Sequence, residues 1–402
     1  MSRLAPLAAL LAAALAAPAL HAQLAVRGET VYPVSGAPIR DGVVLVRGGK
    51  IERVGPASQV AVPAGWRVLT AKVVTPGLVD AHSVVGLAGM LGQGDDQDQL
   101  DRTDAVQPEL RAVDAYNASD PLVAWLRGLG VTTVHTGHGP GALASGQTMV
   151  VKTRGDHVGD AMVDSATMVA FTLGRSVQGN FRTPGTRARG VSMLRTEFLK
   201  AREYERKLKA PGTPPARDLK MEALLEVLSG RRPALFTAQQ APEILAALRL
   251  AREFGFRLVL DGAAEAYLVA DEIRAAGVPV ILHPTMVRTN GETENASLET
   301  AKLLRDAGIP VALQSGFEGY VPKTRVVLFE AAVAAANGLG PDGALRAVTL
   351  DAARAIGMER RVGSLEPGKD ADLALFDGDP FEFTSHVCGV VIEGAVVSDQ
   401  CR

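Results

Sequence analysis

The sequence predicts an α/β protein in which a (β/α)8 TIM-like barrel is joined to a small β-sandwich built from both chain ends. In the middle of the chain, short apolar segments alternate with longer stretches of helical periodicity. Both ends instead contain short strand-like segments separated by turn residues such as Ser-Gly and Gly-Gly. Since 402 residues suffice for one large and one small domain, we expect the barrel over residues 76–360 and the sandwich over 23–75 and 361–402.

Eight apolar segments have the length and composition of buried barrel strands. They are residues 73–82, 131–136, 149–153, 166–171, 233–237, 256–261, 278–283 and 309–314. Two stretches between them, 241–255 and 296–308, carry apolar residues at helical spacing and end in glycine, which is typical of a helix terminus. Residues 181–222 are basic and irregular around one amphipathic helix, so we expect an insertion between strands there.

The composition and the first 22 residues indicate which partners and which cellular compartment to expect. With 47% apolar residues, 21% charged residues and a net charge of −2, nothing favours nucleic acid or an anionic membrane surface as a partner. Residues 1–22 resemble a secretory signal peptide: Arg3 precedes an apolar run, and small residues lead to a cleavage site before Gln23. We therefore expect a periplasmic or secreted protein with no membrane association after cleavage.

The chain has two cysteines, and both lie at its C-terminal end. The segment 386–401 predicts a hairpin that turns at Glu393–Gly394. That turn places Cys388 almost opposite Asp399, so a small offset brings Cys401 within bonding range. An oxidising compartment favours a Cys388–Cys401 disulfide over two free thiols.

Four segments resemble the amidohydrolase superfamily, and in particular its imidazolonepropionase-like members. They are TPGLVDAH (75–82), GVTTVHTGHGPGALASGQ (130–147), LVLDGAAEAY (258–267) and VGSLEPGKDADLALFDGDP (362–380), the last being the most specific. The resemblance spans nearly the whole chain after residue 22. It implies the barrel-and-sandwich fold, hydrolysis of C–N bonds, and a divalent metal such as zinc.

The resemblance also implies metal ligands that this chain lacks. The first barrel strand of the family carries two histidines two residues apart, and here His82 matches the first while Val84 stands at the second. Other ligand positions are occupied by Phe236, Ala238 and Gln240 on strand five, Gly262 on strand six and Gly316 on strand eight. These side chains cannot replace the three or four protein ligands that such a site needs. We therefore expect the usual binuclear site to be absent.

Four histidines follow predicted strands and should gather at the carboxyl-end mouth of the barrel: His82, His135, His138 and His283. One interpretation is a substitute metal site of His82, His135 and His138. Another is a metal-free polar pocket in which His82, His283 and Glu318 are the catalytic candidates. A third is that the histidines only pack the mouth.

The loop after the last predicted strand adds charge near the same mouth. Glu318, Tyr320, Lys323 and Arg325 are candidates for ligand binding, with Tyr320, Lys323 and Arg325 suited to an anion or carboxylate. The alternative is a solvated loop with surface ion pairs. Lys152 could correspond to the carboxylated lysine of some family members, but a structural lysine is favoured.

Two functions of different class follow. The chain is either an exported hydrolase that acts on a C–N bond in a small-molecule or peptide-like ligand with a rearranged site, or a catalytically silent relative. A silent relative would bind a ligand or pair with an active amidohydrolase subunit in a homo- or hetero-oligomer. Metal analysis combined with a hydrolysis screen distinguishes the two.

Overall fold

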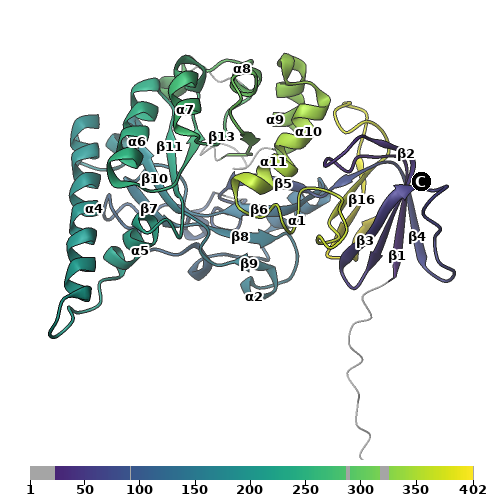
Figure 1. The fold of residues 1–402 in the computed structure, drawn as a ribbon, viewed down its shortest axis with the longest axis horizontal. Coiled ribbons are helices and arrows are strands. Elements are labelled where there is room, and N and C mark those ends of the chain that lie inside the picture. The colour runs from purple at the N-terminus through teal and green to yellow at the C-terminus, as the bar shows by residue number, and fades with distance from the viewer. Residues whose placement is uncertain (1–22, 91, 287–289, 317–325, 402) are drawn as a thin grey trace, which may run out of the picture.

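A computed structural model describes residues 23–90, 92–286, 290–316 and 326–401. Figure 1 shows a sheet built from both chain ends on one side of the molecule, a mixed α/β core in the middle, and the long helix α4 on the far side. Within the described residues, no helix is long and apolar enough to cross a membrane.

Seven strands form the sheet built from the chain ends, here called the terminal sheet. Its strands are β1 (Leu24–Val31), β2 (Ile39–Arg47), β3 (Lys50–Pro56), β4 (Arg67–Pro76), β15 (Leu373–Phe376), β16 (Val387–Ile392) and β17 (Ala395–Asp399). The order β17-β16-β15-β4-β1-β2-β3 places the C-terminal strands beside β4. Neighbouring residues of one strand pack on opposite faces, Leu24 and Val26 on one and Ala25 on the other. Because all seven strands belong to one hydrogen-bonded sheet, the predicted sandwich is not confirmed, and the domain boundaries stay predictions.

The predicted hairpin and its disulfide are present in the terminal sheet. Glu393 and Gly394 have φ angles of 46° and 78°, as a two-residue turn with left-handed residues requires. A bulge between Val390 and Val391 shifts the pairing by one residue. Cys388 and Cys401 are bonded, with Cα atoms 4.6 Å apart.

In the part of the chain that the structure describes, the core contains ten strands in two sheets. They are β5 (Leu78–Ser83), β6 (Val131–Thr136), β7 (Ala144–Gln147), β8 (Met149–Lys152), β9 (Met162–Asp164), β10 (Val169–Leu173), β11 (Ala234–Ala238), β12 (Leu258–Gly262), β13 (Val280–Leu282) and β14 (Val311–Leu313). The sheet orders are β14-β13-β12-β11-β10-β7 and β5-β6-β8-β9. A parallel bridge between Ser83 and Gly316 connects the ends of the two sheets.

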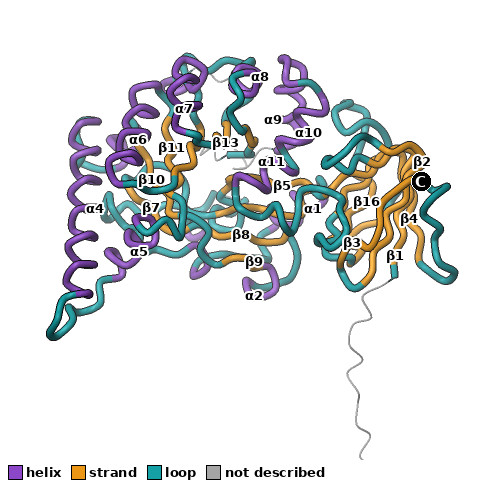
Figure 2. The backbone as a smooth tube through the Cα atoms, in the orientation of Figure 1, coloured by secondary structure: helices purple, strands orange, loops and turns teal. Residues whose placement is uncertain are grey.

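The helices cover the outside of the core strands, as Figure 2 shows most clearly for α4, α6 and α7. They are α1 (Pro121–Gly128), α2 (Val158–Ala161), α3 (Arg175–Asn180), α4 (Arg187–Lys209), α5 (Leu219–Leu228), α6 (Ala241–Phe254), α7 (Ala270–Ala276), α8 (Thr300–Asp306), α9 (Val327–Ala334), α10 (Pro341–Ala347) and α11 (Leu350–Ala355). The predicted insertion, residues 181–222, contains the whole of α4 and the first four residues of α5.

The predicted helix over 241–255 is confirmed as α6, and its ends show why it forms there. Gln240 and Glu243 make a reciprocal capping box at its start. Gly255 ends it with φ 74°, a left-handed conformation that glycine adopts without steric penalty. This helix returns the chain from β11 to the parallel strand β12.

One predicted barrel strand differs from expectation. Seven core strands run parallel to one another, but residues 149–153 form β8, which pairs antiparallel with β6. The adjoining strand β7 likewise pairs antiparallel with β10. Twelve residues, 137–148, separate β6 from β8, and they contain the strand β7 but no crossover helix, which a parallel neighbour usually needs. The prediction of eight parallel strands was therefore wrong at this position.

The interior between the core strands is apolar and is composed of alternate residues from successive strands. It contains Val79, Ala81, Val150, Met168, Leu235, Val259, Ile281 and Ala312, with Ala352, Ala353 and Ile356 from α11 and the turn after it. Residues on the other side of the same strands, such as Phe236 and Leu260, pack instead with the surrounding helices. This alternation determines which side chains continue into the mouth at the carboxyl ends of the strands.

Candidate functional site

His82 lies near the carboxyl end of β5 and is 3% exposed. Its Nδ1 is 2.8 Å from Oδ1 of Asp261, near the end of β12. A carboxylate can only accept, so Nδ1 carries the hydrogen and donates it to Asp261. The neutral imidazole therefore keeps its lone pair on Nε2.

Asp261 is held by two more donors. Thr237 Oγ1 donates to Oδ2 at 2.5 Å, and Gln314 Nε2 donates to Oδ1 at 2.7 Å. These residues come from β11 and from the residue after β14. The carboxylate is thus fixed from three sides, and it in turn fixes the plane of the His82 ring.

Each group shifts the pKa of the other in the direction of its charged form. Burial works against a charged His82, but the Asp261 carboxylate and then Asp80 outweigh it and raise the pKa of the imidazole. Burial alone would raise the pKa of Asp261, but His82, Thr237 and Gln314 together lower it. His82 is accordingly a stronger base than a free imidazole.

His82 Nε2 is buried and has no hydrogen-bond partner among the residues that the structure describes. The imidazole lines a cavity of about 80 Å³ at the carboxyl ends of the strands. The remaining lining residues are Ser83, Val84, Pro140, Thr237, Gln239, Asp261, Gly262, His283, Gln314 and Gly316. A buried lone pair beside a polar cavity is an available base or hydrogen-bond acceptor.

A second cavity of about 100 Å³ adjoins the first, sharing Pro140, Thr237 and Gln239. Gln239 accepts from the main-chain N–H of Ala264 through Oε1 at 3.1 Å. Its Nε2 donates no hydrogen bond to any other residue in the described ranges. Gln239 therefore offers two N–H groups at the boundary between the two cavities.

The other predicted histidines lie in different surroundings. Both ring nitrogens of His135 are in hydrogen bonds, Nδ1 with Ala81 O and Nε2 with Thr148 Oγ1, each at 2.7 Å. Burial lowers the pKa of His135 to about 3 and that of His138 to about 4, so both are neutral. His283 lines the His82 cavity, whereas His135 and His138 do not. The predicted ligand loop with Glu318, Tyr320, Lys323 and Arg325 lies outside the described residues.

The side chains at the cavity do not fit a binuclear metal centre. Val84, Gly262 and Gly316 line the cavity and have no donor atom. Across the described part of the chain, no three His, Cys, Asp or Glu side chains come together to hold a metal ion. The family resemblance also assigned the wrong face of strand β11 to the site. Phe236 and Ala238 pack with the helices, while Thr237 and Gln239 line the cavity.

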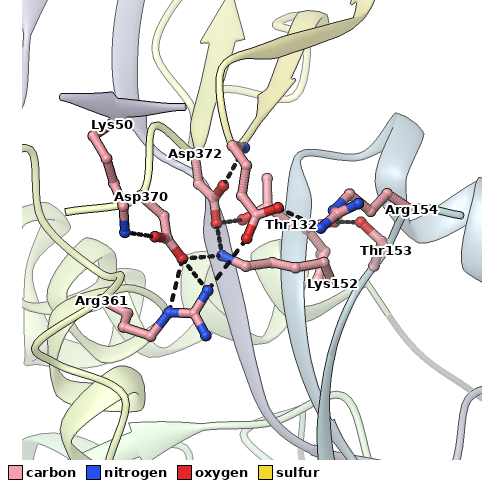
Figure 3. Close-up of polar contacts among 10 residues, drawn as sticks. Lys50, Thr132, Lys152, Thr153, Arg154, Arg361, Asp370 and Asp372 are labelled. Carbon is pink, nitrogen blue, oxygen red and sulfur yellow. Dashed lines mark hydrogen bonds and ion pairs between the residues drawn. The ribbon is translucent and has the colours of Figure 1, made fainter. Parts of the chain in front are cut away.

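Lys152 is not at this cavity, although it is 1% exposed. Figure 3 shows its amine between Asp370 and Asp372, at the junction with the terminal sheet. Asp370 also pairs with Lys50 at 2.5 Å and with Arg361 at 2.9 Å. The interpretation of Lys152 as a structural residue is therefore supported. The carboxylates at this junction come from residues 362–380, the segment with the most specific resemblance to the amidohydrolase superfamily.

Three residues of the site were missed from the sequence: Thr237, Gln239 and Gln314. The available signal was the period of two along β11, since inward-facing Leu235 places Thr237 and Gln239 on the same side. Asp261 lies within the segment 258–267, but no role was predicted for it. Nothing in the local sequence indicates that it contacts His82, 179 residues away.

Comparison with known proteins gives consistent results. A family model described as "Amidohydrolase family" matches residues 269–398. The solved amidohydrolase from Thermotoga maritima MSB8 is 31% identical with a TM-score of 0.88, and the match covers 94% of this chain and all of that one. Imidazolonepropionase from Rhizorhabdus wittichii is 28% identical over 84% of this chain and 88% of its own length. Amidohydrolase tasK from Hapsidospora irregularis is 26% identical over 92% of this chain, which spans 42% of that longer protein.

Proposed function

The chain belongs to the amidohydrolase family, and we propose that it hydrolyses a C–N bond in a cyclic amide or peptide-like small molecule at the His82 cavity. The observation that carries this proposal is the buried His82–Asp261 pair, whose unpartnered Nε2 lies beside the cavity. Relatives named amidohydrolase and imidazolonepropionase support the reaction class.

In the proposed reaction, His82 acts first as a base. Its Nε2 accepts a proton from a water molecule as that water attacks the carbonyl carbon. Asp261 holds the donating tautomer and stabilises the imidazolium that forms. When the C–N bond breaks, the imidazolium returns the proton to the leaving nitrogen, so the products are a carboxylic acid and an amine.

Gln239 is the residue suited to polarise the carbonyl. Its free Nε2 can donate to the oxygen that gains negative charge in the transition state. Gln314 cannot do this, because its Nε2 already donates to Asp261 and to Ile281 O at 2.7 and 3.1 Å. The two glutamines therefore have different roles: Gln314 orients Asp261, and Gln239 contacts the substrate.

We propose that the reaction proceeds without the family's binuclear metal centre. Support comes from Val84, Gly262 and Gly316 at the cavity and from the absence of a three-residue donor cluster in the described ranges. Zinc is therefore assigned no step.

The test is a hydrolysis screen of cyclic amides, N-acyl amino acids and dipeptides with the wild type, His82→Gln and His135→Gln. We expect turnover of at least one substrate class that is lost in His82→Gln. The variant His135→Gln serves as a control, since that residue is buried next to His82 but does not line the cavity. No turnover of any class, or turnover that persists in His82→Gln, would overturn the proposal.

The second candidate is a catalytically silent relative that binds a small ligand or pairs with an active subunit. This function is favoured by Val84, Gly262 and Gly316, which cannot ligate a metal, and by the small volume of the cavity, about 80 Å³. It predicts saturable ligand binding without product formation, so the same screen, followed by mass spectrometry of the bound ligand, distinguishes the two functions.

We also propose that the protein is exported and that its core strands form a TIM-like barrel. The signal-like residues 1–22 and the Cys388–Cys401 disulfide support export. Mass spectrometry of the periplasmic fraction should find a chain that begins at Gln23. A full-length chain that stays in the cytoplasm would contradict export.

A further inference from the structure

Two neighbouring cavities lie at the opposite end of the core strands from His82. One of about 730 Å³ is lined by Pro233, just before β11, and by Leu258 at the start of β12. A second of about 530 Å³ is lined by Pro310 and Val311 at the start of β14. The two share Pro279, Arg354 and Ala355, so they form one continuous groove.

This groove is rich in guanidinium groups. Six arginines line it, against two acidic residues, Asp164 and Asp351; the arginines are Arg231, Arg252, Arg257, Arg305, Arg346 and Arg354. We call it the arginine groove. Apolar residues such as Phe256, Ile309 and Leu339 lie between the charges, so a ligand there contacts both apolar surface and cations.

Part of the positive charge is neutralised within the protein. Arg231 pairs with Glu226 at 2.8 Å. Arg346 and Arg354 share Asp351 at 3.0 and 3.1 Å. Against these two carboxylates, the three guanidinium groups keep about one positive charge.

The other three guanidinium groups have no carboxylate partner among the described residues. Arg257 donates only to main-chain oxygens, Gly230 O at 2.8 Å and Arg231 O at 2.9 Å. Arg252 and Arg305 are exposed and make no ion pair within the same ranges. The guanidinium of Arg305 nevertheless packs closely against the backbone of Gly343. A side chain at that position would collide with it, because a Cβ atom would lie 1.9 Å from Nη1 of Arg305.

Helix ends oppose this positive charge only in part. Helices α6, α7, α8 and α11 end near the groove, at Phe254, Ala276, Asp306 and Ala355, and each helix C-terminus carries about half a negative charge. Arg257 already binds the main-chain oxygens after α5. The three unpaired guanidinium groups and the charge left at Arg346 and Arg354 exceed these partial charges and the Asp164 carboxylate, so the groove is net positive.

We propose that the arginine groove binds a small multivalent anion with two or more phosphate or carboxylate groups. Guanidinium groups bind both chemistries through paired N–H donors. The free cations Arg252 and Arg305 lie in different cavities of the groove, so a ligand that reaches both needs separated anionic groups. Because the groove and His82 lie at opposite ends of β11 and β12, this site is independent of the proposed hydrolysis.

The test is isothermal titration calorimetry at low ionic strength with two probes, tripolyphosphate and the tricarboxylate tricarballylate. It compares the wild type, Arg252→Gln, Arg305→Gln and the double variant. Arg249→Gln is the matched control, because Arg249 lies on the same helix as Arg252, is exposed and does not line the groove. Thermal unfolding of each variant confirms that it is folded.

We expect binding of at least one probe, weakened about fivefold by either single substitution and more than about tenfold by both, since exposed charge-assisted contacts are partly screened. Binding should also weaken as salt is added. Tripolyphosphate binding alone would identify a phosphate site, tricarballylate binding alone a carboxylate site, and both support the proposal. It is overturned if neither probe binds, if the double variant binds like the wild type, or if Arg249→Gln weakens binding equally.

Discussion

His82 Nδ1 donates to Asp261 Oδ1 at 2.8 Å, and this bond joins β5 to β12 across 179 residues of sequence. Both side chains are less than 5% exposed. The bond fixes the imidazole in a buried position with Nε2 beside the cavity. The proposed chemistry depends on this orientation more than on any other contact.

Replacing either member of the pair should remove most activity. His82→Gln deletes the base, and general-base catalysis contributes about 10²- to 10⁴-fold. Asp261→Asn leaves the ring in place but loses the charge that stabilises the imidazolium, and we expect kcat to fall by about 10²-fold or more. The measurement is kcat and KM on the substrate identified by screening. A His82→Gln protein with unchanged kcat contradicts the assignment.

The pH profile should report the same pair. His82 acts as a base when neutral, so activity rises with pH as the imidazole loses its proton. Asp261 raises the pKa of His82. Because Asp261→Asn removes this effect, the rise of activity with pH should occur at lower pH in the variant. A limb that stays in place, or moves to higher pH, shows that another group titrates.

Asp80 should make stability depend on pH. Burial raises its pKa to about 6, although Ser315 N–H and Oγ both donate to the carboxylate. A raised folded-state pKa gives stability that is present below the unfolded value and is lost as pH rises through about 6. Relative to Asp80→Asn, the wild type should lose about 3 kcal/mol of unfolding free energy between pH 4 and 7.

Urea unfolding at several pH values measures this difference. Asp101→Asn is a control of opposite sign, because the Thr103 hydroxyl and N–H lower the pKa of the exposed Asp101. Wild type and Asp80→Asn curves that run parallel over this pH range refute a buried, titrating Asp80.

Lys152→Met should destabilise the protein by about 3 kcal/mol or more, because it leaves the Asp372 carboxylate buried without its cation. Asp370 keeps Lys50 and Arg361 as partners. The comparison is Lys209→Met, which removes an exposed pair with Glu205 and should cost less than about 0.5 kcal/mol. Equal losses for the two variants in urea unfolding would argue against a structural Lys152.

The disulfide closes a loop with a sequence separation of 13. Constraint of the unfolded chain by a loop of this size stabilises by about 3 kcal/mol. The double variant Cys388→Ala/Cys401→Ala should lose that amount, and reduced wild type should lose a similar amount. Free thiols in unreduced, denatured protein would show that the bond does not form.

The fold was largely predictable from local patterns, because strand and helix periodicity depends on near neighbours. Strands at both chain ends and seven of the eight core strands match predicted segments. The direction of β8 was not predicted, because its antiparallel pairing with β6 follows a connection that contains β7 but no crossover helix. A local sequence pattern identifies a strand but does not show whether it pairs parallel or antiparallel with its neighbour.

The site was less predictable, because its contacts join distant strands. Of the four histidines expected at the mouth, His82 and His283 line the cavity and His135 and His138 do not, since the sequence shows where a strand ends but not which side chains meet there. Thr237, Gln314 and the role of Asp261 depend on which side chains meet across the interior. A one-residue error in the phase of β11 was enough to select Phe236 and Ala238 in place of Thr237 and Gln239.

The central claim is that His82 and Asp261, rather than a binuclear metal centre, do the chemistry at the cavity. It is tested most directly by measuring metal content and hydrolysis together, in purified protein before and after dialysis against a chelator. The account predicts substoichiometric metal and activity that is unchanged by the chelator and lost in His82→Gln. Tightly held metal in stoichiometric amounts, with activity that disappears on chelation and returns with zinc, would contradict it.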